Sequence, residues 1–129
     1  MLELKCPFLV QIHTAFQTVI RELLVFPLIF SFLSKEKCCY FVVDFLAGGD
    51  LLHALSKFRK ISENACKHIA AEILLGLKGL HDKKYIYRDL KIENVLIDAE
   101  GHAHICDFGL AKKVDDINAP NYSLCGTPE

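Results

Sequence analysis

The sequence places four polar residues of complementary types close to one another along the chain: Asp89, Lys91, Asn94 and Asp107. Two carboxylates and an amide oxygen are hard oxygen ligands, the kind that hold Mg²⁺ together with a polyphosphate. A lysine beside them suits a phosphoryl oxygen, because a charged donor strengthens the hydrogen bond. The four residues can form one phosphate-handling site only if the chain brings Asp107 back beside Asn94.

A predicted β-hairpin supplies this return. Residues 95–97 (VLI) and 102–106 (HAHIC) are short apolar or mixed segments, and the turn-forming residues 98–101 (DAEG) separate them. Such a pattern is typical of two antiparallel strands joined by a tight turn. We therefore expect Asn94, at the start of the hairpin, and Asp107, at its end, to be neighbours in space.

The remaining elements make the fold class α+β. Residues 8–16 and 38–46 are rich in β-branched and aromatic side chains, which favours strands. Asp50 suits the start of a short helix through about Lys57. Ser62 suits the start of a long helix ending near residues 81–84, whose apolar stripe is Ala65, Ile69, Ile73, Leu77 and Leu80. Residues 112–129 have the composition of a loop.

Composition limits the function classes. The chain has 129 residues, 52% of them hydrophobic, which is enough for a packed core. Its net charge of -1 provides no broad basic field for nucleic acid, so no nucleic-acid partner is expected. The apolar run at residues 23–33 is shorter than the roughly 20 residues of a membrane-spanning helix, so no membrane span is expected. Six cysteines without a CxxC pair, and no leader pattern, favour a reducing setting, either the cytoplasm or the nucleus.

The order Arg-Asp, four residues, Asn and then Asp-Phe-Gly resembles the catalytic loop and metal-binding motif of eukaryotic protein kinases. Tyr87 stands where that family usually has His. The segments YRDLK and CGTPE, with CPFLVQIHTAFQT and FLAGGDL, are similar to the AGC serine/threonine group, which includes the cyclic-nucleotide-dependent kinases, protein kinase C and the ribosomal-protein kinases. The resemblance implies transfer of the γ-phosphoryl of ATP to a Ser or Thr hydroxyl of a protein substrate.

The resemblance also implies a role for each polar residue of the site. Asp89 would accept or orient the proton of the substrate hydroxyl, and Lys91 would neutralise charge on the transferring phosphoryl group. Asn94 and Asp107 would hold Mg²⁺. Catalysis would then depend on placement and charge.

Residues of the nucleotide site follow from the same resemblance. The hinge would be formed by Val43 to Leu46, with backbone groups near Asp44 and Leu46 bonding adenine. Leu96 would lie beneath the ring, although plain core packing explains an apolar residue there equally well. Asp50 and Glu93 would face ribose or a basic substrate peptide, and Asp50 also suits a helix cap.

Regulation is implied in the last part of the chain. Ser123 matches the activation-loop phosphorylation site, which an upstream kinase would modify. A phosphate there could pair with Arg88 and Lys112 and order the loop. Thr127 matches the loop threonine that bonds to the catalytic aspartate and lysine in the family.

The chain also departs from the family. It contains no GxGxxG and no VAIK-like segment, and the match ends before Ala-Pro-Glu. Under the resemblance, residues 1–43 are the end of a small lobe, 44–50 the hinge, and 51–129 the start of a large lobe through the activation loop. Such a piece is expected to be inactive alone, and the alternative is a non-catalytic binding module or pseudokinase.

Two further features of the sequence each allow more than one interpretation. About 16 additional residues at 19–34 form an unusual insertion that is too apolar for a surface loop, and it is either translated non-coding sequence, such as a retained intron, or a docking segment. His102, His104 and Cys106 alternate along one predicted strand and could approach a metal, which gives a weaker zinc-binding reading without an evident fourth ligand.

Overall fold

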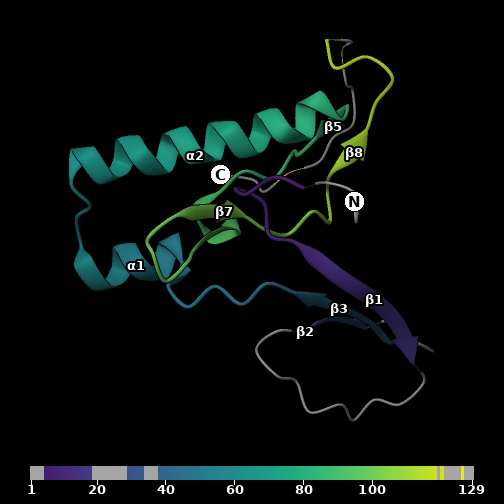
Figure 1. Ribbon diagram of the computed structural model, residues 1–129, viewed down its shortest axis with the longest axis horizontal. Coiled ribbons are helices and arrows are strands. Elements are labelled where there is room, and N and C mark those ends of the chain that lie inside the picture. Colours follow the sequence, from purple (N-terminus) through teal and green to yellow (C-terminus); the bar gives the residue numbers. More distant parts are fainter. Residues whose placement is uncertain (1–4, 19–28, 34–37, 119, 121–125, 127–129) are drawn as a thin grey trace. The chain divides into compact units, whose positions relative to one another are not determined.

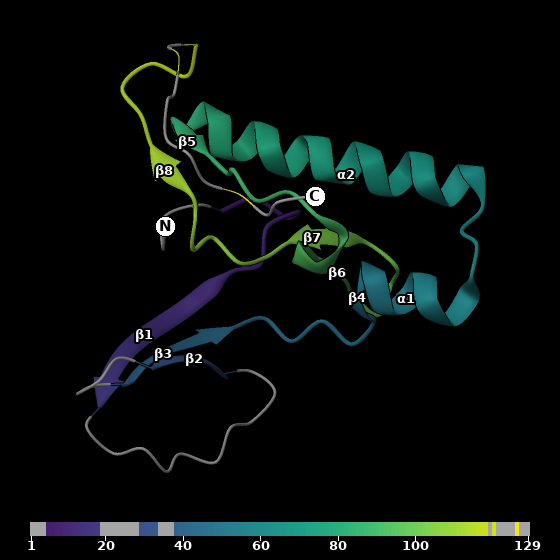
Figure 2. The same cartoon turned by 180° about the vertical axis from the view of Figure 1, so that it is seen from behind.

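The chain forms two compact units (Figures 1 and 2). The computed structural model describes residues 5–18, 29–33, 38–118, 120 and 126. The first unit comprises Met1–Lys5 with Val10–Phe45, and the second comprises Cys6–Leu9 with Leu46–Glu129. Both helices and strands are present, so the predicted mixture of α and β structure is confirmed.

The first unit contains a three-stranded antiparallel sheet in the order β1-β3-β2. Its strands are β1 (Ile12–Thr18), β2 (Ile29–Leu33) and β3 (Cys38–Val43). The two strands predicted in this part are found, although β1 begins later than the sequence pattern indicates. Strand β2 lies inside the apolar segment at residues 19–34. It pairs with β3 in a register that runs from Ile29 opposite Val42 to Leu33 opposite Cys38. The other residues of that segment fall outside the described residues.

Two helices of the second unit begin at the residues predicted to cap them. Helix α1 (Leu51–Phe58) follows Asp50, whose carboxylate accepts a hydrogen bond from the His53 N–H at 2.7 Å. Helix α2 (Glu63–Asp82) follows Ser62, whose hydroxyl accepts from the Ala65 N–H at 3.2 Å. Both caps satisfy an N–H group that has no partner within its own helix.

The core of the second unit lies between the helices and a small sheet in the order β4-β6-β7. The strands are β4 (Gly49–Asp50), β6 (Val95–Ile97) and β7 (Ala103–Ile105), and α2 packs on β7 (Figure 1). Leu51, Val95 and Ala103 are buried there, and partly buried apolar residues pack around them: Leu55, Ile61, Ile69, Ile73 and Ile97. Two residues of the predicted apolar stripe of α2, Ile69 and Ile73, therefore pack against this core.

Residues 8 and 9 differ from their prediction as part of the first strand. Leu9 is buried and forms a parallel bridge with Ile105, and the Ile105 N–H donates to the Phe8 carbonyl at 3.0 Å. Gly76 of α2 makes this approach feasible, since a Cβ atom there would lie 2.9 Å from the Phe8 carbonyl oxygen. Burial of Leu9 in the second unit thus ends the strand pattern before β1.

The predicted loop from residue 112 onward also needs correction. Lys112–Lys113 form β8, which pairs with β5 (Tyr85–Ile86), and the Val114 N–H donates to the Lys84 carbonyl at 2.8 Å. In the described part of the chain, no helix has the length and apolar character needed to cross a membrane.

The close packing at Gly76 generates a stability prediction. Gly76→Ala places a methyl group against the Phe8 backbone and Ile105, and overpacking of this kind costs about 1–3 kcal/mol. Gly79→Ala is the matched control in the same helix, because its methyl group meets the Cys6 side chain rather than a backbone atom, and the Cys6 Sγ can rotate away. Urea denaturation should show a lower free energy of unfolding for Gly76→Ala than for Gly79→Ala. Equal midpoints for the two variants would contradict this account of the packing.

Candidate active site

A buried hydrogen-bonded pair, Asp89 and Asn94, forms the centre of the site. Asp89 is 9% exposed and Asn94 is 6% exposed. The Asn94 amide nitrogen donates to the Asp89 carbonyl at 2.9 Å and to the Asp89 carboxylate at 2.8 Å. The Lys91 ammonium lies 3.2 Å from the same carboxylate oxygen. A charge removed from water needs such partners, and Asp89 therefore has a defined position and orientation.

The segment between β5 and β6 places these side chains through a single turn of 3₁₀ helix, Ile92–Asn94. The Asn94 N–H donates to the Lys91 carbonyl at 3.0 Å, which closes the turn. Val95, the next residue, is almost fully buried in β6. Because the core holds Val95, the turn directs Asn94 inward while Glu93 stays exposed.

The hairpin makes the predicted return. Strands β6 and β7 pair antiparallel, with Val95 opposite Ile105. One residue further, the Cys106 N–H donates to the Asn94 carbonyl at 2.9 Å. Asp107 is the next residue, so the backbone brings it beside Asn94 as the sequence predicts.

Asp107 and Arg88 both have left-handed backbone conformations, with φ of 50° and 71°. Non-glycine residues rarely adopt this conformation, which costs on the order of 1–3 kcal/mol, although Asp tolerates it better than most. The Asp107 carboxylate is exposed and accepts a hydrogen bond from the Gly109 N–H at 3.0 Å. The two strained residues thus adjoin the site at its two ends, immediately before Asp89 and after Cys106.

Tyr87 connects the two segments of the site, a role that its sequence pattern does not predict. It is 2% exposed, its hydroxyl donates to the Cys106 carbonyl, and its ring meets the edge of Phe108 at 5.9 Å between centroids. Burial raises the pKa of Tyr87, so the hydroxyl remains a neutral donor across the physiological range. The available sequence signal was an aromatic hydroxyl directly before Arg88 and Asp89.

Cys106 itself is partly buried. Burial, together with the nearby charge of Asp107, raises the pKa of its thiol to about 11. The thiol is therefore protonated near neutral pH and behaves as a packing group.

The residues predicted to bind the nucleotide belong to both units. Val43 and Asp44 lie in the first unit, where the Asp44 N–H donates to the Gln11 carbonyl and the Asp44 carboxylate lies 2.7 Å from His13 Nε2. Leu46 and Leu96 lie in the second unit. Leu96 is half-buried in β6, and the Leu46 carbonyl accepts from the Gly49 N–H.

The acidic residues predicted to face ribose or substrate lie on neighbouring elements of the second unit. Asp50 pairs with Leu96 between β4 and β6, and its carboxylate also caps α1. Glu93 is exposed on the 3₁₀ turn, which contacts α1. The capping interpretation of Asp50 is confirmed, and it leaves the second carboxylate oxygen for other contacts.

The residues predicted to regulate the site are only partly described. Arg88 is half-buried, and its Nε donates to the Leu110 carbonyl at 2.7 Å, which ties the segment after Asp-Phe-Gly to the segment before Asp89. Lys112 is exposed in β8. Ser123 and Thr127 lie outside the described residues.

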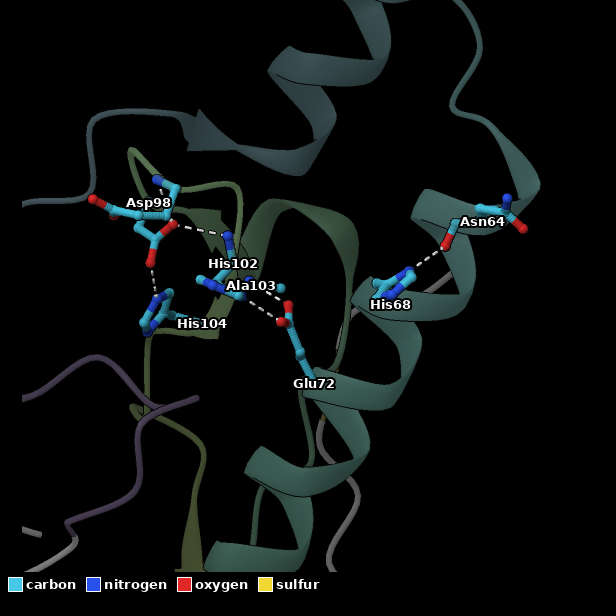
Figure 3. A network of polar contacts seen from close by, with 8 residues as sticks. Asn64, His68, Glu72, Asp98, His102, Ala103 and His104 are labelled. Carbon is cyan, nitrogen blue, oxygen red and sulfur yellow. Dashed lines mark hydrogen bonds and ion pairs between the residues drawn. The ribbon is translucent and has the colours of Figure 1, made fainter.

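The histidines considered for zinc have separate carboxylate partners (Figure 3). His102 Nδ1 lies 2.6 Å from Glu72, and His104 Nε2 lies 3.0 Å from Asp98. Among the described residues, no group of three or more His, Cys, Asp or Glu side chains could hold a metal ion. The proposed trio of His102, His104 and Cys106 is therefore not a ligand set in this structure.

The donor chemistry of Asn94 and Asp107 fits Mg²⁺. The Asn94 nitrogen is committed to Asp89, which orients the amide so that its oxygen is the atom suited to a cation. Asp107 adds an exposed carboxylate one residue beyond the Cys106 to Asn94 hydrogen bond. Mg²⁺ commonly takes only one or two carboxylates from a protein, with water and substrate phosphates as its other ligands.

Comparisons with known proteins show the family of the chain. A family model described as "Protein kinase domain" matches residues 1–129. The chain is 42% identical to "Putative ribosomal protein S6 kinase alpha-1" of Caenorhabditis elegans, over 95% of this chain and 14% of that protein. It is 44% identical to "Ribosomal protein S6 kinase alpha-1" of Mus musculus, over 95% of this chain and 15% of that protein.

A third relative, "Ribosomal protein S6 kinase 2 beta" of Xenopus laevis, is 44% identical over 95% of this chain and 17% of its own length. The chain thus spans less than a fifth of the length of these relatives. The family match, in contrast, covers every residue of the chain. In agreement with its resemblance to the AGC serine/threonine kinases, the chain belongs to the protein kinase domain family.

Proposed function

We propose that this chain carries the catalytic and metal-binding residues of a serine/threonine protein kinase that transfers the γ-phosphoryl group of ATP to protein substrates. The observation that carries the proposal is the hydrogen bond from the Cys106 N–H to the Asn94 carbonyl. It brings Asp107 beside a buried Asp89 and Asn94 pair, as a magnesium nucleotide and a hydroxyl acceptor require.

The geometry supports a distinct role for each residue. Asp89 orients the substrate hydroxyl and accepts its proton, because Asn94 and Lys91 already fix its carboxylate. Lys91 lies beside that carboxylate and neutralises charge on the phosphoryl group. Asn94 and Asp107 hold Mg²⁺, which when bound would offset the negative charge of the phosphates.

Nucleotide and substrate contacts are part of the same proposal. Backbone groups near Val43, Asp44 and Leu46 would bond adenine, and Leu96 would lie beneath the ring. Asp50 and Glu93 give the second unit acidic groups near the site, which suits ribose hydroxyls or basic residues close to the target Ser or Thr.

Regulation would involve a phosphate on Ser123, added by an upstream kinase. Arg88 and Lys112 are its proposed partners, and Thr127 would contact Asp89 and Lys91. The lobe assignment, with residues 1–43, 44–50 and 51–129 as small lobe, hinge and large lobe, is proposed on the same basis, as is a location in the cytoplasm or nucleus.

A non-catalytic binding module is the second candidate. The 129 residues contain neither a GxGxxG loop nor a VAIK-like lysine, two features that grip the phosphates in active kinases, so a measurement of phosphotransfer has to decide between the candidates. Such a product would bind partners or nucleotide and would transfer nothing.

A phosphotransfer assay separates the two candidates. Asp89→Asn removes the group that accepts the proton, so any phosphotransfer by the chain above background should fall by about 10²- to 10⁴-fold, the loss expected for a general base. The rate is measured with ATP, Mg²⁺ and a basic Ser/Thr peptide for the chain, for Asp89→Asn and for Glu63→Gln. The last is a control, because Glu63 lies at the exposed start of α2, where it pairs with Lys67. Equal background rates for all three proteins would favour the binding module.

The metal assignment is tested through binding alone. ATP affinity is measured by calorimetry with and without Mg²⁺ for the chain and for Asp107→Asn. Replacing the carboxylate should reduce the gain in affinity due to Mg²⁺ by about tenfold, or ~1.4 kcal/mol, and should leave metal-free binding unchanged. A gain of the same size in both proteins would remove Asp107 from the metal site.

A further inference from the structure

One carboxylate on α2 lies against the outer edge of the hairpin. Glu72 is largely buried, with a side chain 14% exposed. Its Oε2 accepts a hydrogen bond from the Ala103 N–H at 2.8 Å, and its Oε1 lies 2.6 Å from His102 Nδ1 (Figure 3). Glu72 and His102 both lie outside the catalytic and metal-binding set described above.

The contact with Ala103 matters because β7 is the edge strand of its sheet. In the pairing with β6, the backbone of His104 lies opposite Leu96 and faces that strand. The N–H groups of its two neighbours, Ala103 and Ile105, therefore point away from β6. The Ala103 N–H donates to Glu72, and the Ile105 N–H donates to the Phe8 carbonyl. Glu72 thus holds one end of an edge that would otherwise expose unpaired donors.

We propose that Glu72 is a positioning residue, which clamps the β6–β7 hairpin onto α2 and so keeps Asp107 beside Asn94, and that protonation of His102 tightens this clamp. The link to Asp107 rests on the proposed kinase function. The clamp itself depends only on the contacts of Glu72, His102 and Ala103.

Charges around the pair give the clamp a pH dependence. The hydrogen bond with Glu72 raises the pKa of His102, and the charges of Glu72, Asp98 and Glu100 act in the same direction. Burial works to raise the pKa of Glu72, but the hydrogen bonds from Ala103 and His102 lower it on balance. His68 lies one turn earlier on α2, where its Nδ1 bonds the Asn64 carbonyl of the same helix (Figure 3).

The two pKa shifts determine how the stability of the clamp changes with pH. His102 has a raised pKa in the folded chain, so its stabilisation is complete below its ordinary value of 6.5 and is lost as pH rises through the raised value. Glu72 has a lowered pKa, so its stabilisation is present above 4.5 and is lost as pH falls through the lowered value. The clamp is therefore strongest between these two ordinary values and weakens as the medium becomes alkaline.

Amide hydrogen exchange tests the clamp without any nucleotide. Protection of the Ala103 N–H, corrected for the intrinsic effect of pH, is measured from pH 6 to pH 8 in the 129-residue chain. Protection should fall as pH rises through the raised pKa of His102, and by less than the roughly tenfold per pKa unit of full linkage, because the His102 side chain is largely exposed. His102→Asn keeps a donor near the Nδ1 position but cannot titrate, so its protection should not vary with pH.

Two further variants complete the exchange test. Glu72→Gln should lower protection of Ala103 at pH 6 and remove its pH dependence, because the charge is lost. His68→Asn should behave like the unsubstituted chain, since His68 bonds within its own helix. A wild-type pH profile in His102→Asn, or unchanged protection in Glu72→Gln, would overturn the clamp.

The link to Asp107 is tested separately, by measuring how much Mg²⁺ increases the affinity for ATP at each pH. Titration of the ATP phosphates affects both proteins alike, so this gain should be lower at pH 8, relative to pH 6, in the chain than in His102→Asn. A gain that varies with pH equally in both proteins would overturn the positioning role. Absence of any Mg²⁺-dependent binding in the unsubstituted chain would instead count against the proposed function, while the exchange result would still decide the clamp.

Discussion

The hydrogen bond between the Cys106 N–H and the Asn94 carbonyl is the contact on which the candidate site depends. It continues the β6–β7 ladder by one residue, so the register of a very short hairpin decides where Asp107 lies. A slip of one residue would turn each side chain of β7 to the other face of the sheet and expose the buried Ala103 and Ile105. Burial of these two apolar residues therefore fixes the position of a polar one.

The polar centre of the site is expensive to bury and is correspondingly well bonded. Asp89 and Asn94 bond each other, and Lys91 adds an opposite charge. Around them, the left-handed conformations of Arg88 and Asp107 store strain, which the surrounding contacts must hold. The hydroxyl of the buried Tyr87 and the guanidinium of Arg88 provide such contacts, at the Cys106 and Leu110 carbonyls.

Elements that depend on neighbouring residues could be predicted from the sequence. Asp50 and Ser62 cap α1 and α2 through hydrogen bonds to residues three positions ahead, so their sequence pattern contains the whole interaction. The hairpin turn is equally local, because the Asp98 carboxylate accepts from the His102 N–H within the turn. The spacing of Asp89, Asn94 and the Asp-Phe-Gly motif identified the candidate site for the same reason.

What the sequence determined by itself was therefore the caps, the turn, the helical stripe and the family motif, all of which are written in short stretches of residues. Tertiary structure alone decided that Leu9 joins Ile105 rather than β1, that residues 112 and 113 form a strand with β5, and that Glu72 bonds Ala103. Each of these contacts joins segments far apart in the sequence. Their partners are selected by burial and by the need to satisfy edge N–H groups, and neither is visible until the chain has folded.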